Sequence, residues 1–232
     1  MRLLLIPILL TSSAFSDTYI QNSTISNSII GDNFSTTTQQ ISTVSITKHI
    51  KLNKKFSRIN IRFPVKVVVK QSSNSDVILK IDKKFIDNVS FKVYNDTLHV
   101  DTHGSINTNI ATEIVIHTKL LDMLTVGGTT RASIEGFYST NFNLRTSGTS
   151  RVTFLSGGIE NFFLNSRGTS QISLENIETK NATIVSKGTS KTTINVSNNL
   201  NVKLRGISKV KYFGNPKIQK NIKNLGKLIK LN

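Results

Sequence analysis

Apolar and polar residues alternate with a period of two along most of the chain from about residue 50 onward. In the second half, the alternation is organised around a recurring glycine. Phe142 and Leu144 lie six and four residues before Gly148, and Val152 and Phe154 lie four and six residues after it. Residues two apart share one face of a β-strand but lie on roughly opposite sides of a helix. The pattern therefore predicts two short strands for each glycine, each with one face turned inward.

The glycine returns at a nearly constant interval in a short phrase, which reads Gly-Thr-Ser-Arg in one of its clearest copies. The spacings are 20, 20, 20, 18 and 20 residues, and the glycines are Gly128, Gly148, Gly168, Gly188, Gly206 and Gly226. So short and regular a period is typical of a solenoid, in which each repeat forms one coil stacked on its neighbour. Glycine suits the turn between the strands because a positive φ costs it little energy.

A column of side-chain amides supports this stacking. The position seven residues before each glycine holds Asn141, Asn161, Asn181 and Asn199, and Gln219 in the last copy. Stacked amides can hydrogen-bond to the copies above and below them. Less regular segments, such as Gly157-Gly158-Ile159, would form a third side. We therefore predict an all-β fold: a right-handed parallel β-helix, or three-sided β-solenoid, with about 20 residues per coil.

The residues before this regular region alternate in the same way but lack the regular glycine, as in Ile59, Ile61 and Phe63. We expect irregular first coils, with a tight turn at Asn95-Asp96. They would continue into regular coils from about residue 122, in one solenoid domain over residues 49–232.

Two interpretations remain open for residues 217–232. Ile218, Ile222, Leu225 and Ile229 would line one face of a basic amphipathic helix. Alternatively, Ile222 lies four residues before Gly226, as the repeat requires, and the segment forms a frayed last coil. We favour the coil, because a 20-residue return is harder to obtain by chance.

The N-terminal region has the features of a targeting segment. Residues 1–16 combine Arg2, an apolar run from Leu3 to Leu10 and a small-x-small site at Ala14-Phe15-Ser16, which predicts a signal peptide. Its apolar run is too short to span a bilayer. Residues 17–48 are polar and of low complexity, and we expect a tether or an N-terminal cap. The protein would thus be exported to the periplasm, the outer-membrane surface or the medium, with no transmembrane segment.

Several short motifs follow one another in a recognisable order. They are Phe56-x-x-Ile59-x-Ile61, Val65-x-Val67-x-Val69, Asn95-x-Thr97-Leu98-x-Val100, the repeated Ser-Gly phrases and Tyr212-x-Gly214-x-Pro216. From Phe56 to the C-terminus the chain resembles the head GIN domain family, exported bacterial proteins described as adhesins. The resemblance implies a parallel β-helix, export to the periplasm or surface, and no established catalytic activity.

The chain departs from that family at one point. Where the family usually reads Ser-Gly-Ser-Gly-Asp, this chain reads Ser147-Gly148-Thr149-Ser150-Arg151. The second glycine is replaced by serine and the acidic position is basic, so roles of the family's aspartates do not carry over.

The chain is strongly basic, with 30 Lys and Arg against 13 Asp and Glu and a net charge of +17. Stacking would align part of this charge in columns three residues after and one residue before the glycine, beside a column of threonines. The candidate ligand-binding residues are Arg131, Arg151, Gln171, Lys191, Lys209, Arg167, Lys187, Arg205, Thr129, Thr149, Thr169 and Thr189. Rows of cations and hydroxyls suit phosphate, sulfate or uronate groups spaced along a polymer.

The expected partner is therefore an anionic polysaccharide, lipopolysaccharide or a host surface polymer. A solvated basic face that keeps the chain soluble would look the same in sequence. We do not expect nucleic acid, since the chain has no Trp and does not interleave aromatic with basic residues on an outward face. The open sheet edges at the ends of a solenoid allow homo-oligomers.

The sequence shows no arrangement of residues that is typical of a catalytic site or a metal site. Glu135 and Glu175 would share one column, but Leu155 separates them. His99, Asp101 and His103 alternate along one predicted strand without a fourth ligand. The chain has no cysteine, which excludes disulfides and thiolate metal sites.

We therefore predict a non-enzymatic, adhesin-like interaction module with no cofactor. A polysaccharide-active β-helix enzyme and a purely structural envelope protein are the alternatives.

Overall fold

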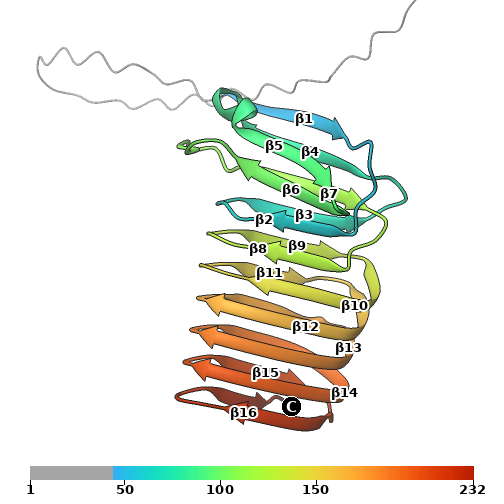
Figure 1. The fold of residues 1–232 in the computed structure, drawn as a ribbon, viewed down its shortest axis with the longest axis vertical. Helices are drawn as coiled ribbons and strands as arrows, with labels where there is room; N and C mark the ends of the chain where they lie inside the picture. Colours follow the sequence, from blue (N-terminus) through green and yellow to red (C-terminus); the bar gives the residue numbers. More distant parts are fainter. Residues whose placement is uncertain (1–43) are drawn as a thin grey trace, which may run out of the picture.

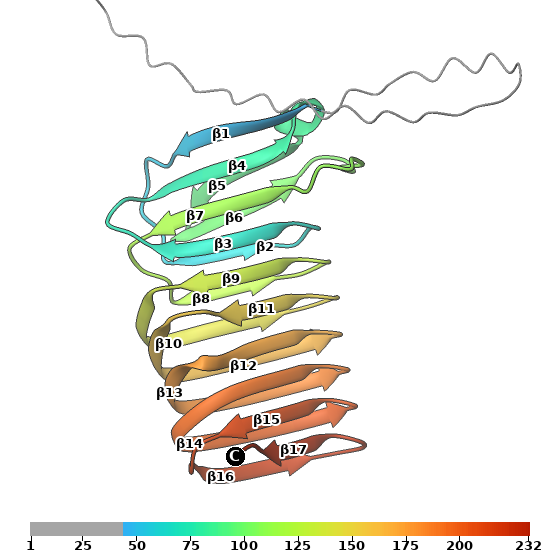
Figure 2. The same cartoon turned by 180° about the vertical axis from the view of Figure 1, so that it is seen from behind.

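Seventeen β-strands and one short 3₁₀ helix make up the secondary structure of residues 44–232, which a computed structural model describes. The predicted signal peptide, and all but the end of the 17–48 segment, lie outside the described residues. All the strands join one continuous hydrogen-bonded sheet that winds into an elongated stack (Figures 1 and 2). Across the described residues, no helix is long and apolar enough to cross a membrane.

Regular coils occupy the second half of the chain. Their strands are β8 (Met123–Val126), β9 (Arg131–Glu135), β10 (Phe137–Thr146), β11 (Arg151–Phe154), β12 (Gly157–Gly168), β13 (Gln171–Gly188), β14 (Lys191–Gly206), β15 (Lys209–Phe213), β16 (Lys217–Ile222) and β17 (Lys227–Lys230).

Each coil repeats the one before it in register. Leu144 pairs with Leu164 in a parallel ladder on one side, and Val152 pairs with Ile172 in a parallel ladder on the other. A short third ladder joins 137–139 to 157–159. The predicted parallel β-solenoid is thus confirmed. Figure 1 shows its two edges: sharp glycine turns on the left and the bends of the third side on the right.

The first part of the chain has shorter elements. They are β1 (Ser45–Lys51), β2 (Arg58–Ile61), β3 (Lys66–Gln71), β4 (Asp76–Asp82), the 3₁₀ helix η1 (Lys83–Asn88), β5 (Val89–Tyr94), β6 (Thr97–Thr102) and β7 (Glu113–Thr118).

These first strands do not stack in chain order, an irregularity of topology that the expectation of irregular first coils did not include. β2 pairs with β6 on one side and with β8 on the other, and β3 pairs likewise with β7 and β9. The coil formed by β2 and β3, called the inserted coil below, therefore lies between two coils made later in the chain (Figure 2). Alternation fixes which face of a strand is buried but not which neighbour it pairs with.

Antiparallel strands close the N-terminal end of the stack. β4 lies antiparallel between β1 and β7, and β5 lies antiparallel to β6. The turn between β5 and β6 is formed by Asn95 and Asp96, at φ 48° and 58°, which confirms the predicted tight turn. Two consecutive positive φ values are typical of a hairpin turn that matches the twist of its strands.

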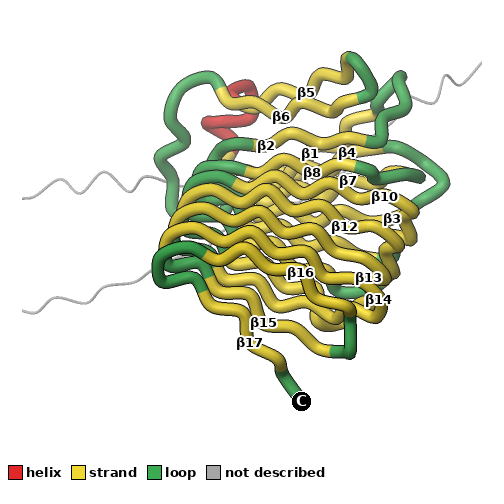
Figure 3. Tube along the Cα trace, turned by 60° about the horizontal axis from the view of Figure 1, so that its bottom comes forward, coloured by secondary structure: helices red, strands yellow, loops and turns green. Residues whose placement is uncertain are grey.

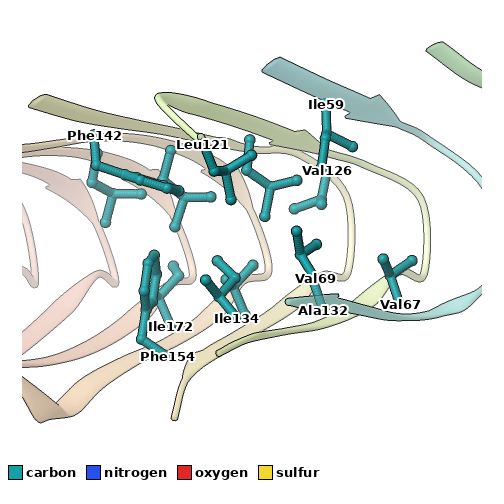
Figure 4. Close-up of a cluster of buried hydrophobic side chains, with 14 of the residues drawn as sticks. Ile59, Val67, Val69, Leu121, Val126, Ala132, Ile134, Phe142, Phe154 and Ile172 are labelled. Atoms are coloured by element: carbon teal, nitrogen blue, oxygen red, sulfur yellow. The ribbon is translucent and has the colours of Figure 1, made fainter. Parts of the chain in front are cut away.

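Figure 3 shows the coils stacked one behind another. The hydrophobic core lies between their two long faces, and Figure 4 shows part of it. Its largest side chains are Phe142, Phe154 and Phe162, whose ring centroids lie 5.2 to 6.3 Å apart. All three aromatic rings come from positions six residues from a turn glycine, which the alternation predicts to be buried. The inward-facing pattern of the regular coils therefore follows from the sequence.

The last coil is a coil, as favoured, but its register differs from the prediction. Asn199 pairs with Lys217, and Gln219 pairs with Asn201 rather than continuing the asparagine column. Asn224, at φ 63°, takes the turn position that the sequence assigned to Gly226. The interval from the turn at Gly206 to the turn at Asn224 is therefore 18 residues. The pairing agrees, because Lys209, three residues after Gly206, pairs with Lys227, three residues after Asn224. The assignment of Gly226 to the repeat was therefore wrong.

Candidate functional site

The glycine turns hold successive coils in close backbone contact. Gly168 has φ 93°, and a Cβ placed on it would lie 2.8 Å from the carbonyl oxygen of Gly148. The amide of Thr169 donates to that same oxygen at 2.9 Å. The turn therefore requires glycine both for its conformation and for its close contact, and it fixes the threonine that follows with its side chain exposed.

A ladder of buried hydroxyls lies directly beneath these turns. Ser150 and Ser170 are hydrogen-bonded at 3.2 Å, and Ser190 donates to Ser208 at 3.3 Å. The sequence marked Ser150 only as a departure from a glycine-rich family pattern. The structure shows that this position points inward at the corner, where a small side chain fits and its hydroxyl finds a partner in the next coil.

The row three residues after the turn forms as predicted. Parallel pairing aligns Arg131, Arg151, Gln171, Lys191 and Lys209 in register. All but the half-buried Lys209 are exposed. Together with the threonine row, these side chains line a groove whose residues include Thr129, Arg131, Thr149, Arg151, Thr169, Gln171, Thr189 and Lys191.

The row just before the turn also forms. Arg167, Lys187 and Arg205 are paired in register and exposed. The two basic rows and the threonines between them follow the edge of the stack where the glycine turns lie. We call this surface the basic ridge. The structure thus brings together all twelve candidate residues along one edge of the stack.

The structure extends the basic ridge beyond the sequence assignment. The inserted coil adds Lys66, which pairs with Arg131, and Arg62, whose side chain lies against Gly127. The last coil adds Lys227, paired with Lys209. Sequence reasoning missed the first two because the inserted coil is out of chain order. It missed Lys227 because of the two-residue register error in the last turn.

A second groove lies beside the first, on the β8, β10 and β12 side of the basic ridge. Its arginines are Arg62, Arg145 and Arg167, and its polar neighbours are Thr125, Ser147 and Asn165. Arg62 Nε donates to Asn60 Oδ1 at 3.1 Å, which orients its guanidinium. Three guanidinium groups around one groove suit bidentate recognition of sulfate, phosphate or carboxylate groups.

Few carboxylates lie close enough to neutralise the basic ridge. Lys66 pairs with Glu113 at 2.9 Å. Arg151 Nε donates to Gln171 Oε1 at 3.1 Å. Among the described residues, none of the seven predicted lysines and arginines of the basic ridge forms an ion pair. Their charges therefore face solvent uncompensated.

The glutamates considered for catalysis, and one of the histidines considered for a metal site, contact other side chains. Glu135 pairs with Lys70 at 3.1 Å, and Glu175 accepts a hydrogen bond from Ser173 at 3.1 Å. His99 stacks on Tyr94 with ring centroids 4.0 Å apart. Within residues 44–232, no three His, Cys, Asp or Glu side chains are grouped as metal ligands would be.

The sequence and the fold were compared with those of known proteins. The sequence matches the family described as "Putative auto-transporter adhesin, head GIN domain" over residues 55–216. Comparison with curated protein sequences gives no match.

Several solved structures of bacterial proteins have a similar fold. A putative adhesin of Bacteroides fragilis superimposes with a TM-score of 0.63 at 19% identity, covering 81% of this chain and 97% of that one. A putative adhesin of Parabacteroides merdae gives 0.56 at 13%, covering 81% and 96%. One from Parabacteroides distasonis gives 0.54 at 15%, covering 81% and 97%. At these identities the likeness is one of fold.

Proposed function

The chain belongs to the head GIN domain family, and from this membership we propose that it is an exported, non-enzymatic adhesin-like module that binds anionic polymers through the basic ridge. The ligand class is a sulfated or uronate-rich polysaccharide, or the phosphorylated region of lipopolysaccharide. A host surface polymer of the same charge would meet the same groups.

One observation carries this proposal: the seven predicted lysines and arginines of the basic ridge stand in register and form no ion pair within the described residues. Successive coils are about 4.8 Å apart. At that distance two like charges repel by roughly 1 kcal/mol in water before salt screening. A bound polyanion would turn this repulsion into attraction. The exposed threonine hydroxyls beside the cations would donate hydrogen bonds to the same anionic groups.

The shape of the basic ridge favours a polymer over a single small anion. The groove beside the threonine row is lined by residues of four successive coils, which include Thr129, Thr149, Thr169 and Thr189. A small anion would contact one or two of these coils. A chain with a charge on each repeat would contact all of them, and the contributions would add.

Retention on immobilised heparin and on lipopolysaccharide at physiological salt tests the proposal. We expect the wild-type protein to be retained, and the double variant Arg151→Glu with Lys191→Glu to lose retention without a lower melting temperature. The control is Lys51→Glu with Lys92→Glu, which changes the net charge equally at exposed sites on the N-terminal strands. It should be retained almost as well as the wild type.

Equal retention of the two double variants would contradict the proposal, because binding would then depend on net charge and not on the basic ridge. No retention of the wild-type protein on either matrix would contradict it as well. A reducing-sugar assay on acidic polysaccharides checks the non-enzymatic part, for which we expect no release of product.

A further inference from the structure

A further groove lies on the third side of the coil. The bends of this side form the edge opposite the glycine turns (Figure 1). Parallel pairing stacks Tyr138 beside Gly158 and Gly158 beside Glu178. The adjacent outward positions hold Thr140, Glu160 and Lys180, and these residues together line one groove. We call it the tyrosine groove.

Tyr138 is an exposed aromatic residue whose ring lies against Gly158 of the next coil. Its side chain is 76% exposed, far more than a tyrosine that packs for stability. A Cβ on Gly158 would lie 3.3 Å from Tyr138 Cδ1, so the ring leans against bare backbone. Any larger side chain at 158 would push the ring away. An aromatic ring that is both exposed and positioned offers a flat apolar face to a ligand.

The polar rim of the tyrosine groove differs in charge from the basic ridge. Lys180 Nζ donates to Glu160 Oε1 at 2.6 Å, and this hydrogen bond raises the pKa of Lys180. Glu178 forms no ion pair within the described residues. The rim therefore carries one net negative charge, which disfavours an anionic ligand.

We propose that the tyrosine groove binds an uncharged sugar ring. A pyranose has one face of C–H groups, which can stack on Tyr138, and a rim of hydroxyls, which can donate to Glu160 and Glu178 and accept from Lys180. This surface is separate from the basic ridge, and the inference does not depend on the proposed function. It gives the protein two recognition surfaces on opposite edges, one for anionic polymers and one for uncharged sugars.

Titration calorimetry with neutral oligosaccharides (malto-, cello-, xylo- and N-acetylchito-oligomers) tests the inference on the full chain. We expect saturable binding of at least one of them. Tyr138→Ala should weaken it at least about tenfold, and Tyr138→Phe should keep it because the ring face remains. Gly158→Val should also weaken binding by displacing the ring. Tyr94→Ala, at an exposed tyrosine near the other end of the stack, is the matched control and should bind as the wild type does.

The absence of tryptophan from the sequence gives an independent readout. Tyr138→Trp would place a single tryptophan in the tyrosine groove, and its fluorescence should change saturably with the same oligosaccharide.

The inference is overturned if none of the oligosaccharides binds, or if Tyr138→Ala binds as well as the wild type. It is also overturned if Arg151→Glu with Lys191→Glu abolishes the binding, since that would place the sugar on the basic ridge. Heparin retention of Tyr138→Ala should be unchanged, which keeps the two proposals distinguishable.

Discussion

The corner of each coil shows how closely a single position can be specified. The turn glycine is needed for its positive φ, and the residue two positions later must be small because it points into the corner. A threonine or serine there finds a partner for its hydroxyl: Thr130 donates to the backbone carbonyl of Phe63 at 2.8 Å, and Ser150 is hydrogen-bonded to Ser170. These two requirements explain why the repeated phrase keeps its glycine and its buried hydroxyl while its exposed fourth position varies.

Substituting a turn glycine should be costly because of close contact as well as conformation. We expect Gly168→Ala to lower the free energy of unfolding by about 2 kcal/mol or more. Gly104→Ala is the control, because Gly104 also has a positive φ but the nearest atom to its Cβ would be 3.6 Å away. It should lose about 1 kcal/mol. Chemical denaturation of both variants checks this, and equal losses would contradict the contact argument.

Two buried threonines differ in whether their hydroxyls have a partner. Thr192 Oγ1 is buried without a hydrogen-bond partner within the described residues, in a column otherwise filled by apolar side chains. We expect Thr192→Val to raise the free energy of unfolding by about 1 kcal/mol. Thr146→Val should lower it by about 1 kcal/mol, since Thr146 Oγ1 donates to Ser166 Oγ at 3.0 Å. Thermal melts should shift in opposite directions, and a common direction would count against the explanation.

At the scale of strands and coils, the regular half was predictable because every copy carries the same information. The asparagine ladder is one result: Asn181 Nδ2 donates to Asn161 Oδ1 at 3.0 Å, and Asn199 Nδ2 donates to Asn181 Oδ1 at 2.7 Å. Register was predictable wherever the phrase was intact. The candidate rows of the basic ridge followed directly from that register.

Strand pairing could not be predicted where the repeat is absent, as in the inserted coil, or where it is misleading, as in the last coil. The inserted coil pairs with strands far away in the chain, and no local pattern encodes that choice. Arg62 and Lys66 were missed for this reason. In the last coil, Gly226 suggested a 20-residue interval, whereas Asn224 makes the turn at 18. Asn can adopt positive φ, so the physical requirement was met by a residue that the pattern did not include.

The register of the last coil can be tested at that asparagine. Asn224→Gly should leave stability unchanged or raise it slightly, while Asn224→Val should lower it by about 1 to 2 kcal/mol because a β-branched residue resists positive φ. Asn221→Val, on the exposed strand β16, is the control and should change it by less than about 0.5 kcal/mol. Equal effects of the two valine substitutions would contradict the assignment of the turn to Asn224.

At the scale of the whole molecule, the stacked architecture brings like charges close together, and their repulsion destabilises the stack. The chain carries a net charge of +17, and several of its cations are aligned along one edge of a narrow stack. Both end strands carry lysines, Lys48 and Lys51 on β1 and Lys217 and Lys220 on β16. Lysines on edge strands discourage further strand pairing.

Self-repulsion on this scale makes stability depend on salt. Raising sodium chloride from about 0.01 M to about 1 M shortens the Debye length from about 30 Å to about 3 Å. We expect the melting temperature to rise by several degrees. The variant Arg151→Glu with Lys191→Glu should rise less, because its basic ridge has less repulsion to screen. A melting temperature independent of salt would contradict this account of the charge.

The inserted coil also constrains when the protein can fold. A ribosome completes residues 58–71 well before the strands that flank them, since β7 ends at Thr118 and β9 at Glu135. Until those strands emerge, the early segment has no partner on either side, and pairing over such sequence distances is intrinsically slow. A nascent chain therefore cannot complete the inserted coil before β9 has been made. Such a delay would suit the export that we propose for this chain, because a segment without its partners stays open for passage through a membrane.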